Sequence, residues 1–290
     1  MMEGQSITGA TQICGIIGDP IEHTMSPVMH NAAFRQLGMD WAYLPFRVGQ
    51  EAVGMAIEGV RALNIRGLNV TIPHKTAVIP YLDGLDPAAE RMGAVNTIVN
   101  DNGKLTGYNT DAAGFLKALR ENNIEPEGTN IVVLGAGGAS RGISFLLAEN
   151  GADLTILNRR RERAEDLAGQ ISTATGTGVK ALALDEANLS LALEKADVLV
   201  NTTRVGMIPD VDRTPVPAGQ LRSDLAVFDI VYNPLKTRLL ADAGAAGALT
   251  IGGLEMLVWQ GALAFTLWTG QAPPVDLMRK AAREALENED

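Results

Sequence analysis

The stretch at residues 131–141, with the sequence IVVLGAGGASR, constrains the fold of this 290-residue chain more than any other. Four apolar, mostly β-branched residues precede a glycine turn, an order typical of a buried parallel strand that turns into a helix. Gly135 and Gly137 allow a tight turn and a close approach of the backbone to a phosphate. A helix that opens at Ala139 directs N–H groups and the positive end of its dipole to the same place.

Such a turn alone is weak evidence, because any α/β protein can carry two glycines between a strand and a helix, and Ser140 replaces the third glycine of the common fingerprint. A second predicted strand, at 153–157, follows at the spacing of a βαβ unit and ends in Asn158. We therefore interpret the turn as a dinucleotide-binding site rather than a merely structural connection. Its residues are Gly135, Ala136, Gly137, Gly138 and Ala139.

The end of the second strand predicts NADP rather than NAD as the cofactor. Folds that select NAD place an acidic residue there to bind the ribose 2′-hydroxyl, and this chain has Asn158. Arg159, Arg160 and Arg163 follow, and arginines form charge-assisted, often bidentate bonds to phosphates. The alternative is a solvated basic start of a helix.

Composition argues against several classes of protein. With 46% hydrophobic and 20% charged residues the chain is typical of globular proteins, and no apolar run approaches the roughly 18 residues of a membrane span. A formal net charge of −10 argues against a nucleic-acid surface. Cys14 is the only cysteine, which we expect to be a buried thiol, and residues 1–10 lack the apolar core of a signal peptide. We expect a cytoplasmic protein that binds a small-molecule substrate, without nucleic-acid or membrane partners.

Before residue 131 the hydrophobic pattern alternates between strands and helices, which predicts a mostly parallel sheet with helices on its faces. The expected strands are 11–17, 42–48, 67–71, 95–99 and 104–108, and the expected helices are 26–37, 51–63 and 111–121. Asn102 and Gly103 between the last two strands are a strong signal for a hairpin, which we expect to close the sheet.

From residue 131 onward the pattern predicts a doubly wound sheet followed by two helices. The expected strands are 131–134, 153–157, 179–183, 197–201, 226–230 and 248–251, and the final helices are 254–268 and 275–287. The predicted fold class is α/β with two domains. Residues 1–120 form an N-terminal α/β substrate-binding and catalytic domain, completed by the C-terminal helices of 254–290. Residues 121–253 form a C-terminal Rossmann-type, doubly wound NADP-binding domain.

Lys75 and Asp111 are candidate catalytic residues, because each lies in a loop at a strand end, where ligands gather in such sheets. When hydride from a nicotinamide reaches a carbonyl carbon, negative charge develops on the oxygen. An ammonium group can stabilise that oxygen and donate a proton, and a carboxylate can hold the lysine and substrate hydroxyls in place. The alternatives are a solvated lysine and an aspartate that only caps its own helix.

Several motifs, in order along residues 18–260, resemble those of the shikimate/quinate dehydrogenase family. They are GDPIEHTMSP at 18–27 with His30-Asn31, NVTIPHK at 69–75, GAVNT at 93–97, GYNTD at 107–111, GAGGAS at 135–140, Asn158-Arg159, NTT at 201–203 with Gly206-Met207, and GGL at 252–254 with Gln260. The resemblance implies an oxidoreductase that uses NADPH to reduce 3-dehydroshikimate reversibly to shikimate. This reaction belongs to the shikimate pathway of chorismate and aromatic amino-acid biosynthesis.

The resemblance also implies roles for individual residues. Thr24 and Ser26 match two hydroxyl residues that bind the substrate carboxylate, although Ser26 could be only a helix N-cap, and Lys75 and Asp111 match the catalytic pair. The further substrate contacts that it implies are Asn69, Thr71, Asn96, Tyr232 and Gln260. The further cofactor contacts that it implies are Thr202, Thr203 and Gly253.

Three residues depart from the family's pattern. Thr24 stands where serine is usual, Arg204 where a small polar residue is frequent, and His74 where an aromatic residue such as phenylalanine is frequent. The extra methyl group of Thr24 narrows the carboxylate pocket. We therefore expect shikimate to be preferred to quinate, which carries an additional hydroxyl on that ring carbon.

Other functions remain open at this point. They are a quinate/shikimate dehydrogenase of catabolic direction, a non-catalytic NADP-binding regulator, and another two-domain dehydrogenase acting on amino acids or folates. The presence of both Lys75 and Asp111 argues against a regulator, and the Thr24/Ser26 motif argues against the third class. No metal is expected, because the three histidines lie on different loops without ligand spacing. The sequence is compatible with a monomer or a homodimer.

Overall fold

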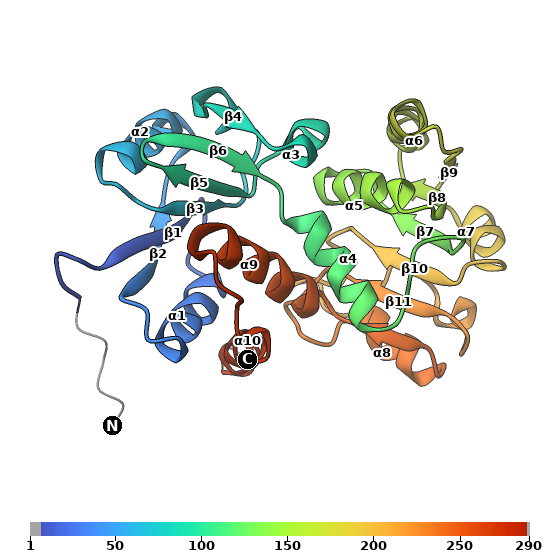
Figure 1. The fold of residues 1–290 in the computed structure, drawn as a ribbon. Helices are drawn as coiled ribbons and strands as arrows, with labels where there is room; N and C mark the ends of the chain where they lie inside the picture. Colours follow the sequence, from blue (N-terminus) through green and yellow to red (C-terminus); the bar gives the residue numbers. More distant parts are fainter. Residues whose placement is uncertain (1–6, 289–290) are drawn as a thin grey trace. The chain divides into compact units, whose positions relative to one another are not determined.

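The computed structural model describes residues 7–288, which form two compact units. One unit contains the chain up to Thr110 and again from Val258 onward, and the other contains Asp111–Leu257. In the described residues each unit has a six-stranded sheet with helices packed against it (Figure 1). The predicted two-domain α/β fold is confirmed. The first division falls at Asp111, where the helix Asp111–Glu121 begins, and the second falls after Leu257, inside the helix Gly253–Thr269. The boundaries expected from the sequence are residues 120 and 253.

The first unit contains a mixed sheet. Its elements are β1 (Gln12–Gly18), α1 (Ser26–Gln36), β2 (Trp41–Arg47), η1 (Gln50–Ala52), α2 (Val53–Ala62), β3 (Gly67–Val70), η2 (Ile79–Tyr81), β4 (Gly84–Leu85), α3 (Pro87–Met92), β5 (Thr97–Asp101), β6 (Lys104–Tyr108) and α10 (Val275–Glu287). The strand order is β2-β1-β3-β5-β6-β4. Strands β2, β1 and β3 run parallel, whereas β5 is antiparallel to both β3 and β6.

The predicted hairpin joins β5 to β6. Asn102 and Gly103 have φ angles of 53° and 91°, as expected for a two-residue turn that follows the twist of the strands. The hairpin does not close the sheet as we expected, because β4 pairs with β6 beyond it. A strand of two residues is too short to show an alternating hydrophobic pattern, so β4 was not predicted from the sequence.

The second unit has the doubly wound topology predicted for it. Its elements are α4 (Asp111–Glu121), β7 (Asn130–Leu134), α5 (Gly138–Glu149), β8 (Asp153–Asn158), α6 (Arg161–Thr175), β9 (Lys180–Ala183), α7 (Glu186–Leu193), β10 (Val198–Asn201), η3 (Ala218–Gln220), β11 (Ala226–Asp229), α8 (Arg238–Ala245), β12 (Leu249–Ile251) and the start of α9 (Gly253–Thr269). The strand order is β12-β11-β10-β7-β8-β9, and all neighbours are parallel. The order reverses beside β7, where ligands bind in such sheets.

Helices cover both faces of this sheet (Figure 1). On one face Val227 of β11 belongs to a buried cluster with Leu193 of α7 and Leu239 of α8. On the other face the ring of Phe228 lies 4.5 Å from that of Phe115 on α4, measured between centroids. Burial on both sides accounts for the nearly continuous apolar runs that identified these strands.

The final part of α9 packs in the first unit. The indole Nε1 of Trp268 donates a hydrogen bond to the Ile98 carbonyl at 3.0 Å, and Arg66 Nε donates to the Trp268 carbonyl at 2.9 Å. Helix α10 lies against α1 in the same unit. Although α9 is rich in apolar residues, no helix within residues 7–288 is long and apolar enough to cross a membrane.

A histidine lies in the aromatic core of the first unit. His30 is 0% exposed and stacks on Tyr43, with ring centroids 4.4 Å apart and an interplanar angle of 9°. Within residues 7–288 neither of its ring nitrogens has a hydrogen-bond partner. Burial lowers the pKa of His30 from 6.5 to about 3, so the imidazole is neutral in the folded protein at neutral pH.

This lowered pKa makes stability depend on pH. Above pH 6.5 the group is neutral in both states, but below it the unfolded chain takes up a proton that the folded chain does not. The free energy of unfolding therefore decreases by about 1.4 kcal/mol per pH unit as pH falls from 6.5 toward 3. His30→Phe keeps a stacking ring and removes this titration.

We expect the stability of His30→Phe, relative to the parent, to rise by about 2 kcal/mol between pH 7.5 and pH 5.0. Urea unfolding at the two pH values measures this difference. His23→Gln, at an exposed position, is the matched control and should follow the parent. Parallel changes in the parent and in His30→Phe would contradict the assignment.

Candidate active site

The two hydroxyl residues of the first motif lie next to each other between β1 and α1. Thr24 Oγ1 accepts a hydrogen bond from the backbone N–H of Ser26 at 3.4 Å. Ser26 is the first residue of α1, but the N-cap is Met25 and no side chain caps this helix. The alternative that Ser26 serves only as an N-cap is therefore wrong. Its hydroxyl instead interacts with the phenol of Tyr43, a buried side chain.

Tyr43 also fixes the amide of Asn69 on β3. The phenol donates a hydrogen bond to Asn69 Oδ1 at 2.7 Å, while Asn69 Nδ2 donates to the Asn96 carbonyl at 3.2 Å and to Thr97 Oγ1 at 3.0 Å. Both N–H bonds of the amide are thus used within the protein, and Oδ1 retains one lone pair. If Asn69 binds a ligand, it can only accept a hydrogen bond, as it would from a hydroxyl group.

Asn96 lies beside Asn69 and ties two further segments together. Its Oδ1 accepts a hydrogen bond from the Thr110 backbone N–H at 2.7 Å, and its Nδ2 donates to Thr110 Oγ1 at 2.9 Å. Asn96 Nδ2 also reaches Gln260 Oε1 on α9 at 3.4 Å. The first unit therefore brings together Asn69, Asn96 and Gln260, three of the residues predicted to contact substrate.

Lys75 lies in a loop that is anchored on both sides. Thr71 opens the loop with a backbone hydrogen bond to Ile17 at 3.0 Å, and the Lys75 carbonyl accepts from Val95 N at 2.7 Å. Buried His74 contacts the Val48 carbonyl through Nε2 at 2.6 Å, so Nε2 carries the proton. The histidine thus holds the loop at the end of β2, where the family often has an aromatic side chain.

Asp111, the other candidate catalytic residue, is the first residue of α4 and of the second unit. It directly follows Thr110, whose backbone and hydroxyl are both bonded to Asn96. Thr110, the residue before Asp111, is therefore held by Asn96, one of the predicted substrate residues.

In the second unit the glycine turn adopts the predicted form. Gly135 has a φ angle of 111°, which only glycine adopts readily, and an added Cβ would lie 2.7 Å from Thr202 Oγ1. Helix α5 begins at Gly138, one residue earlier than expected, with Gly137 as its N-cap. Ser140 stands where a third glycine is common, and its buried hydroxyl donates to the Gly135 carbonyl at 2.7 Å. The serine that departs from the common fingerprint thus stabilises the turn.

Thr202 and Thr203 follow β10, the neighbour of β7. Thr202 Oγ1 donates to the Leu134 carbonyl at 2.6 Å, which places this residue beside the glycine turn. Thr203 donates to Asn201 Oδ1 from its backbone N–H at 3.0 Å and from its hydroxyl at 2.7 Å. Arg204, which departs from the family's pattern, is exposed in the same loop.

The predicted arginine cluster lies at the end of β8, on the other side of β7. Asn158 Nδ2 donates to the Arg160 carbonyl at 2.8 Å and shapes the entry into α6. Arg159, Arg160 and Arg163 are exposed, and no acidic side chain within residues 7–288 pairs with them. By contrast, Arg161 forms an ion pair with Glu165 at 2.8 Å. Three cations are therefore available to an anionic ligand.

Tyr232 follows β11 and Gly253 follows β12, the two strands beyond β10 in the sheet. Tyr232 is half-buried in the loop that follows β11. Gly253 begins α9, and a Cβ there would collide with the Ile230 carbonyl. The predicted cofactor residues thus lie at the carboxyl ends of β7, β8, β10 and β12.

The sequence analysis missed three polar residues that hold the predicted ones. Tyr43 and Asp229 lie in segments that it interpreted only as strands, and Thr110 appeared only within the GYNTD motif. A tyrosine and an aspartate in otherwise apolar strands were the available signal. Their amide partners, Asn69 for Tyr43, Asn201 for Asp229 and Asn96 for Thr110, belong to other segments of the chain and could not be inferred from the sequence.

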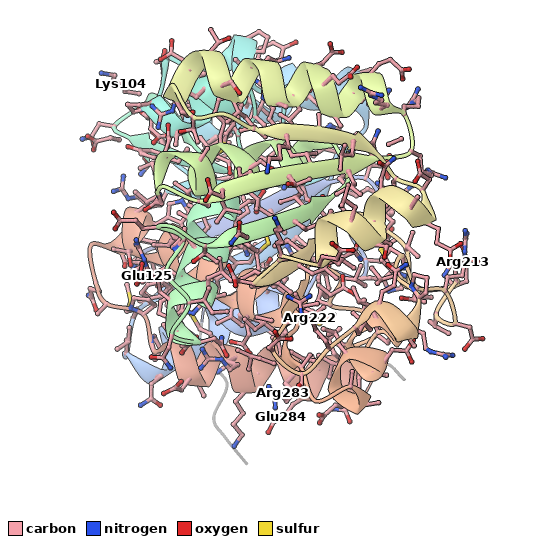
Figure 2. The ribbon with its side chains drawn as sticks, turned by 90° about the vertical axis from the view of Figure 1, so that its right-hand side faces the viewer. Lys104, Glu125, Arg213, Arg222, Arg283 and Glu284 are labelled. Atoms are coloured by element: carbon pink, nitrogen blue, oxygen red, sulfur yellow. The ribbon has the colours of Figure 1, made fainter. Side chains whose placement is uncertain are left out.

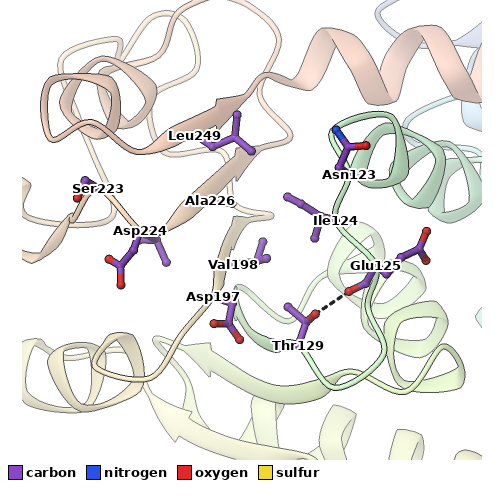
Figure 3. A pocket seen from close by; sticks show the side chains of 11 residues that line it. Asn123, Ile124, Glu125, Thr129, Asp197, Val198, Ser223, Asp224, Ala226 and Leu249 are labelled. Carbon is purple, nitrogen blue, oxygen red and sulfur yellow. Dashed lines mark hydrogen bonds between the residues drawn. The ribbon is translucent and has the colours of Figure 1, made fainter.

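A pocket of about 320 Å³ lies at the opposite edge of the second sheet (Figure 3). Its lining includes Thr129, Asp197, Asp224 and Leu249, which lie at or just before the amino ends of strands. Thr129 Oγ1 donates to the Glu125 carbonyl at 2.6 Å, and the Glu125 side chain points outward (Figures 2 and 3). No predicted site residue lines this pocket, and the predicted cofactor residues lie at the other ends of these strands.

Comparison with known families gives three matches along the chain. The family described as shikimate dehydrogenase substrate binding domain matches residues 16–98. Residues 118–231 match shikimate / quinate 5-dehydrogenase, and residues 253–283 match the shikimate 5′-dehydrogenase C-terminal domain. The matches cover parts of both units.

Individual relatives agree over nearly the full length. The shikimate dehydrogenase (NADP(+)) of Methanopyrus kandleri is 50% identical over 284 residues, which are 97% of this chain and 98% of that protein. The shikimate 5-dehydrogenase of Listeria monocytogenes, solved with shikimate and NAD, has a TM-score of 0.90 at 42% identity and covers 94% and 97% of the two chains. The enzyme of Thermus thermophilus, solved with NADP(H) and shikimate, has a TM-score of 0.85 at 42% identity, with coverages of 94% and 99%.

The Tyr43–Asn69 bond can be tested by Tyr43→Phe. The change leaves Asn69 Oδ1 buried without the phenol as its donor, so we expect the free energy of unfolding to fall by about 1–3 kcal/mol. The amide also loses its fixed orientation, so KM for the substrate should rise. Urea unfolding and steady-state kinetics measure the two effects. Tyr81→Phe, at a position 43% exposed, should change stability by less than about 0.5 kcal/mol, and an equal loss in both variants would refute the role of this bond.

Proposed function

The chain belongs to the shikimate dehydrogenase family, and on that premise we propose that it catalyses the reversible, NADPH-dependent reduction of 3-dehydroshikimate to shikimate. The observation that carries this proposal is the full-length match to NADP-dependent shikimate dehydrogenases, at 50% identity over 97% of the chain. We assign the reaction to the shikimate pathway of aromatic amino-acid biosynthesis. We place it in the cytoplasm, in keeping with a single cysteine that is free and buried. The enzyme acts as a monomer or a homodimer.

We assign the substrate to the residues gathered in the first unit. Thr24 and Ser26 would bind the carboxylate with their hydroxyl groups. Thr71, Gln260 and the Asn69–Asn96 pair would hold the ring hydroxyls. Asn69 would only accept a hydrogen bond from a hydroxyl, through Oδ1, because its N–H groups already donate to protein acceptors. We assign Tyr232 as a further substrate contact.

The residues of the second unit fit NADP. Apart from the neighbouring residues and the backbone of α5 itself, no atom lies within 4 Å of a Cβ built at Gly137 or Gly138, so a pyrophosphate can approach the backbone at the start of α5. Arg159, Arg160 and Arg163 would bind the 2′-phosphate, and Asn158 brings no negative charge to that place. We assign Thr202, Thr203 and Gly253 as further cofactor contacts. When bound, the nicotinamide supplies the hydride.

The acid–base chemistry is assigned to Lys75 and Asp111. As hydride reaches the carbonyl carbon, the Lys75 ammonium would stabilise the oxygen and donate its proton to it. The Asp111 carboxylate would orient the lysine and a substrate hydroxyl. In the direction of shikimate oxidation the lysine would take the proton back.

The experiment that tests this function is a turnover assay with shikimate and quinate, each with NADP and with NAD. We expect the highest kcat/KM for shikimate with NADP. A higher value for quinate would identify the catabolic alternative, and NADP binding without turnover would identify a regulator. Thr24→Ser, assayed in parallel, should narrow the preference for shikimate if the Thr24 methyl causes it.

Arg159→Ala tests the assignment of the 2′-phosphate. Because only NADP carries that phosphate, KM for NADP should rise by about tenfold or more while KM for NAD changes little. Arg161→Ala is a matched control, since Arg161 is one of the same run but is paired with Glu165. Equal effects of Arg159→Ala on both cofactors would refute the assignment.

Lys75→Ala, Asp111→Asn and the double variant test the catalytic pair. Each single change should lower kcat by about 10² or more, the usual range for general acid–base groups. If both residues serve one proton transfer, the double variant should be little worse than either single variant. Lys104→Ala removes an exposed lysine from the hairpin and should leave turnover unchanged. Near-normal turnover in Lys75→Ala would end the proposal, and additive losses would end the idea of a single unit.

A further inference from the structure

Asp229, the last residue of β11, carries a carboxyl group with 0% exposure. Its Oδ1 accepts hydrogen bonds from Asn201 Nδ2 at 2.9 Å and from Val231 N at 3.1 Å, and its Oδ2 accepts from Thr237 Oγ1 at 2.7 Å. Burial raises its pKa to about 6, and these three bonds act in the opposite direction. At neutral pH the group is therefore mostly ionised, with neutral donors as its partners. Burying a charge among neutral partners costs free energy of folding, which points to a role for this carboxylate.

The carboxylate decides how the loop after β10 is built. An ionised carboxylate only accepts hydrogen bonds, so the Asn201 amide must turn Nδ2 toward Asp229 and Oδ1 away from it. Oδ1 then accepts from the backbone N–H and the hydroxyl of Thr203. The Asn201–Asp229 pair therefore holds the turn that carries Thr202 and Thr203.

The same carboxylate holds both ends of the loop after β11. Val231 N and Thr237 Oγ1 bind it from the two sides of the segment that carries Tyr232. Thr237 is also the N-cap of α8, and its Oγ1 accepts from Leu240 N at 3.3 Å. One buried group thus fixes the start and the end of this loop.

We propose that Asp229 is a positioning residue for the reaction, a single buried carboxylate that sets the conformation of both the Thr202–Thr203 turn and the loop bearing Tyr232. The inference rests on the proposed function, because these two segments are its assigned cofactor and substrate contacts. Asp229 itself touches neither ligand in this scheme. Its effect on cofactor binding passes through Asn201, and its effect on the substrate passes through Val231 and Thr237.

Comparing Asp229→Asn with Thr237→Val distinguishes the effect of Asp229 on the Thr202–Thr203 turn from its effect on the loop that bears Tyr232. In Asp229→Asn the new amide can orient its oxygen toward only one of its two sets of partners, and the charge is lost. We expect the Kd for NADPH, measured by fluorescence without substrate, and KM for shikimate each to rise by about tenfold. Thr237→Val removes the hydrogen bond to Asp229 and the N-cap of α8 but leaves the Asn201–Asp229 pair in place. KM for shikimate should therefore rise by about fivefold while the Kd for NADPH stays within about twofold of the parent.

Asp224→Asn is the matched control, because Asp224 lies near the other end of β11, is 74% exposed and pairs with Arg222. It should leave both quantities unchanged. Values within about twofold of the parent for Asp229→Asn, in a parent that turns over shikimate, would overturn the inference. An inactive parent that binds NADPH would instead overturn the proposed function. If Asp229→Asn does not fold, Thr237→Val decides: a change in the substrate KM alone supports the inference, and any other pattern overturns it.

Discussion

Buried amide and carboxyl groups must be hydrogen-bonded inside a protein, and both units depend on this requirement for the loops that carry their predicted site residues. In the first unit the Tyr43 phenol, Asn69 and Asn96 form one connected network that reaches Thr110. In the second unit Asp229 and its partner amide play the same part. Each network includes residues of strands, where the sheet holds the backbone, and extends from them to a loop.

The acidic balance of the chain and the binding of an anionic cofactor do not conflict. The net charge of −10 describes the whole molecule, whereas recognition of a phosphate depends on charges within about one Debye length, roughly 8–10 Å. Arg159, Arg160 and Arg163 lie together on the surface, and no acidic side chain in the described part of the chain pairs with them. Arg161, in the same run, differs from them because it forms an ion pair with Glu165. A few local cations and a helix N-terminus are thus sufficient for the proposed site.

Most of the fold could be predicted from the sequence because parallel strands buried on both faces leave long apolar runs, and α10 was predicted with its observed bounds. The short strand β4 could not be predicted, because two residues cannot show an alternating hydrophobic pattern. Local chemistry was predictable too, as at Gly135, where a positive φ angle requires glycine. The role of Ser140 was not, since its hydroxyl binds a carbonyl five residues earlier, an interaction that no spacing rule for the turn contains. The partner of Asn69 was likewise hidden, because Tyr43 reaches it from another strand.

Burial also gives the two units opposite responses to acid. It lowers the pKa of His30, a base, to about 3, and raises the pKa of Asp229, an acid, from 3.8 to about 6. For the acid, the folded chain binds the proton more tightly than the unfolded chain, so its contribution to stability is complete below pH 3.8 and is lost as pH rises through 6. For the base, the contribution is complete above pH 6.5 and is lost as pH falls. Between pH 4 and 6 the two slopes, each about 1.4 kcal/mol per pH unit, therefore oppose one another. A flat stability profile in that range would conceal two buried ionisable groups, and only removing one of them would reveal the other.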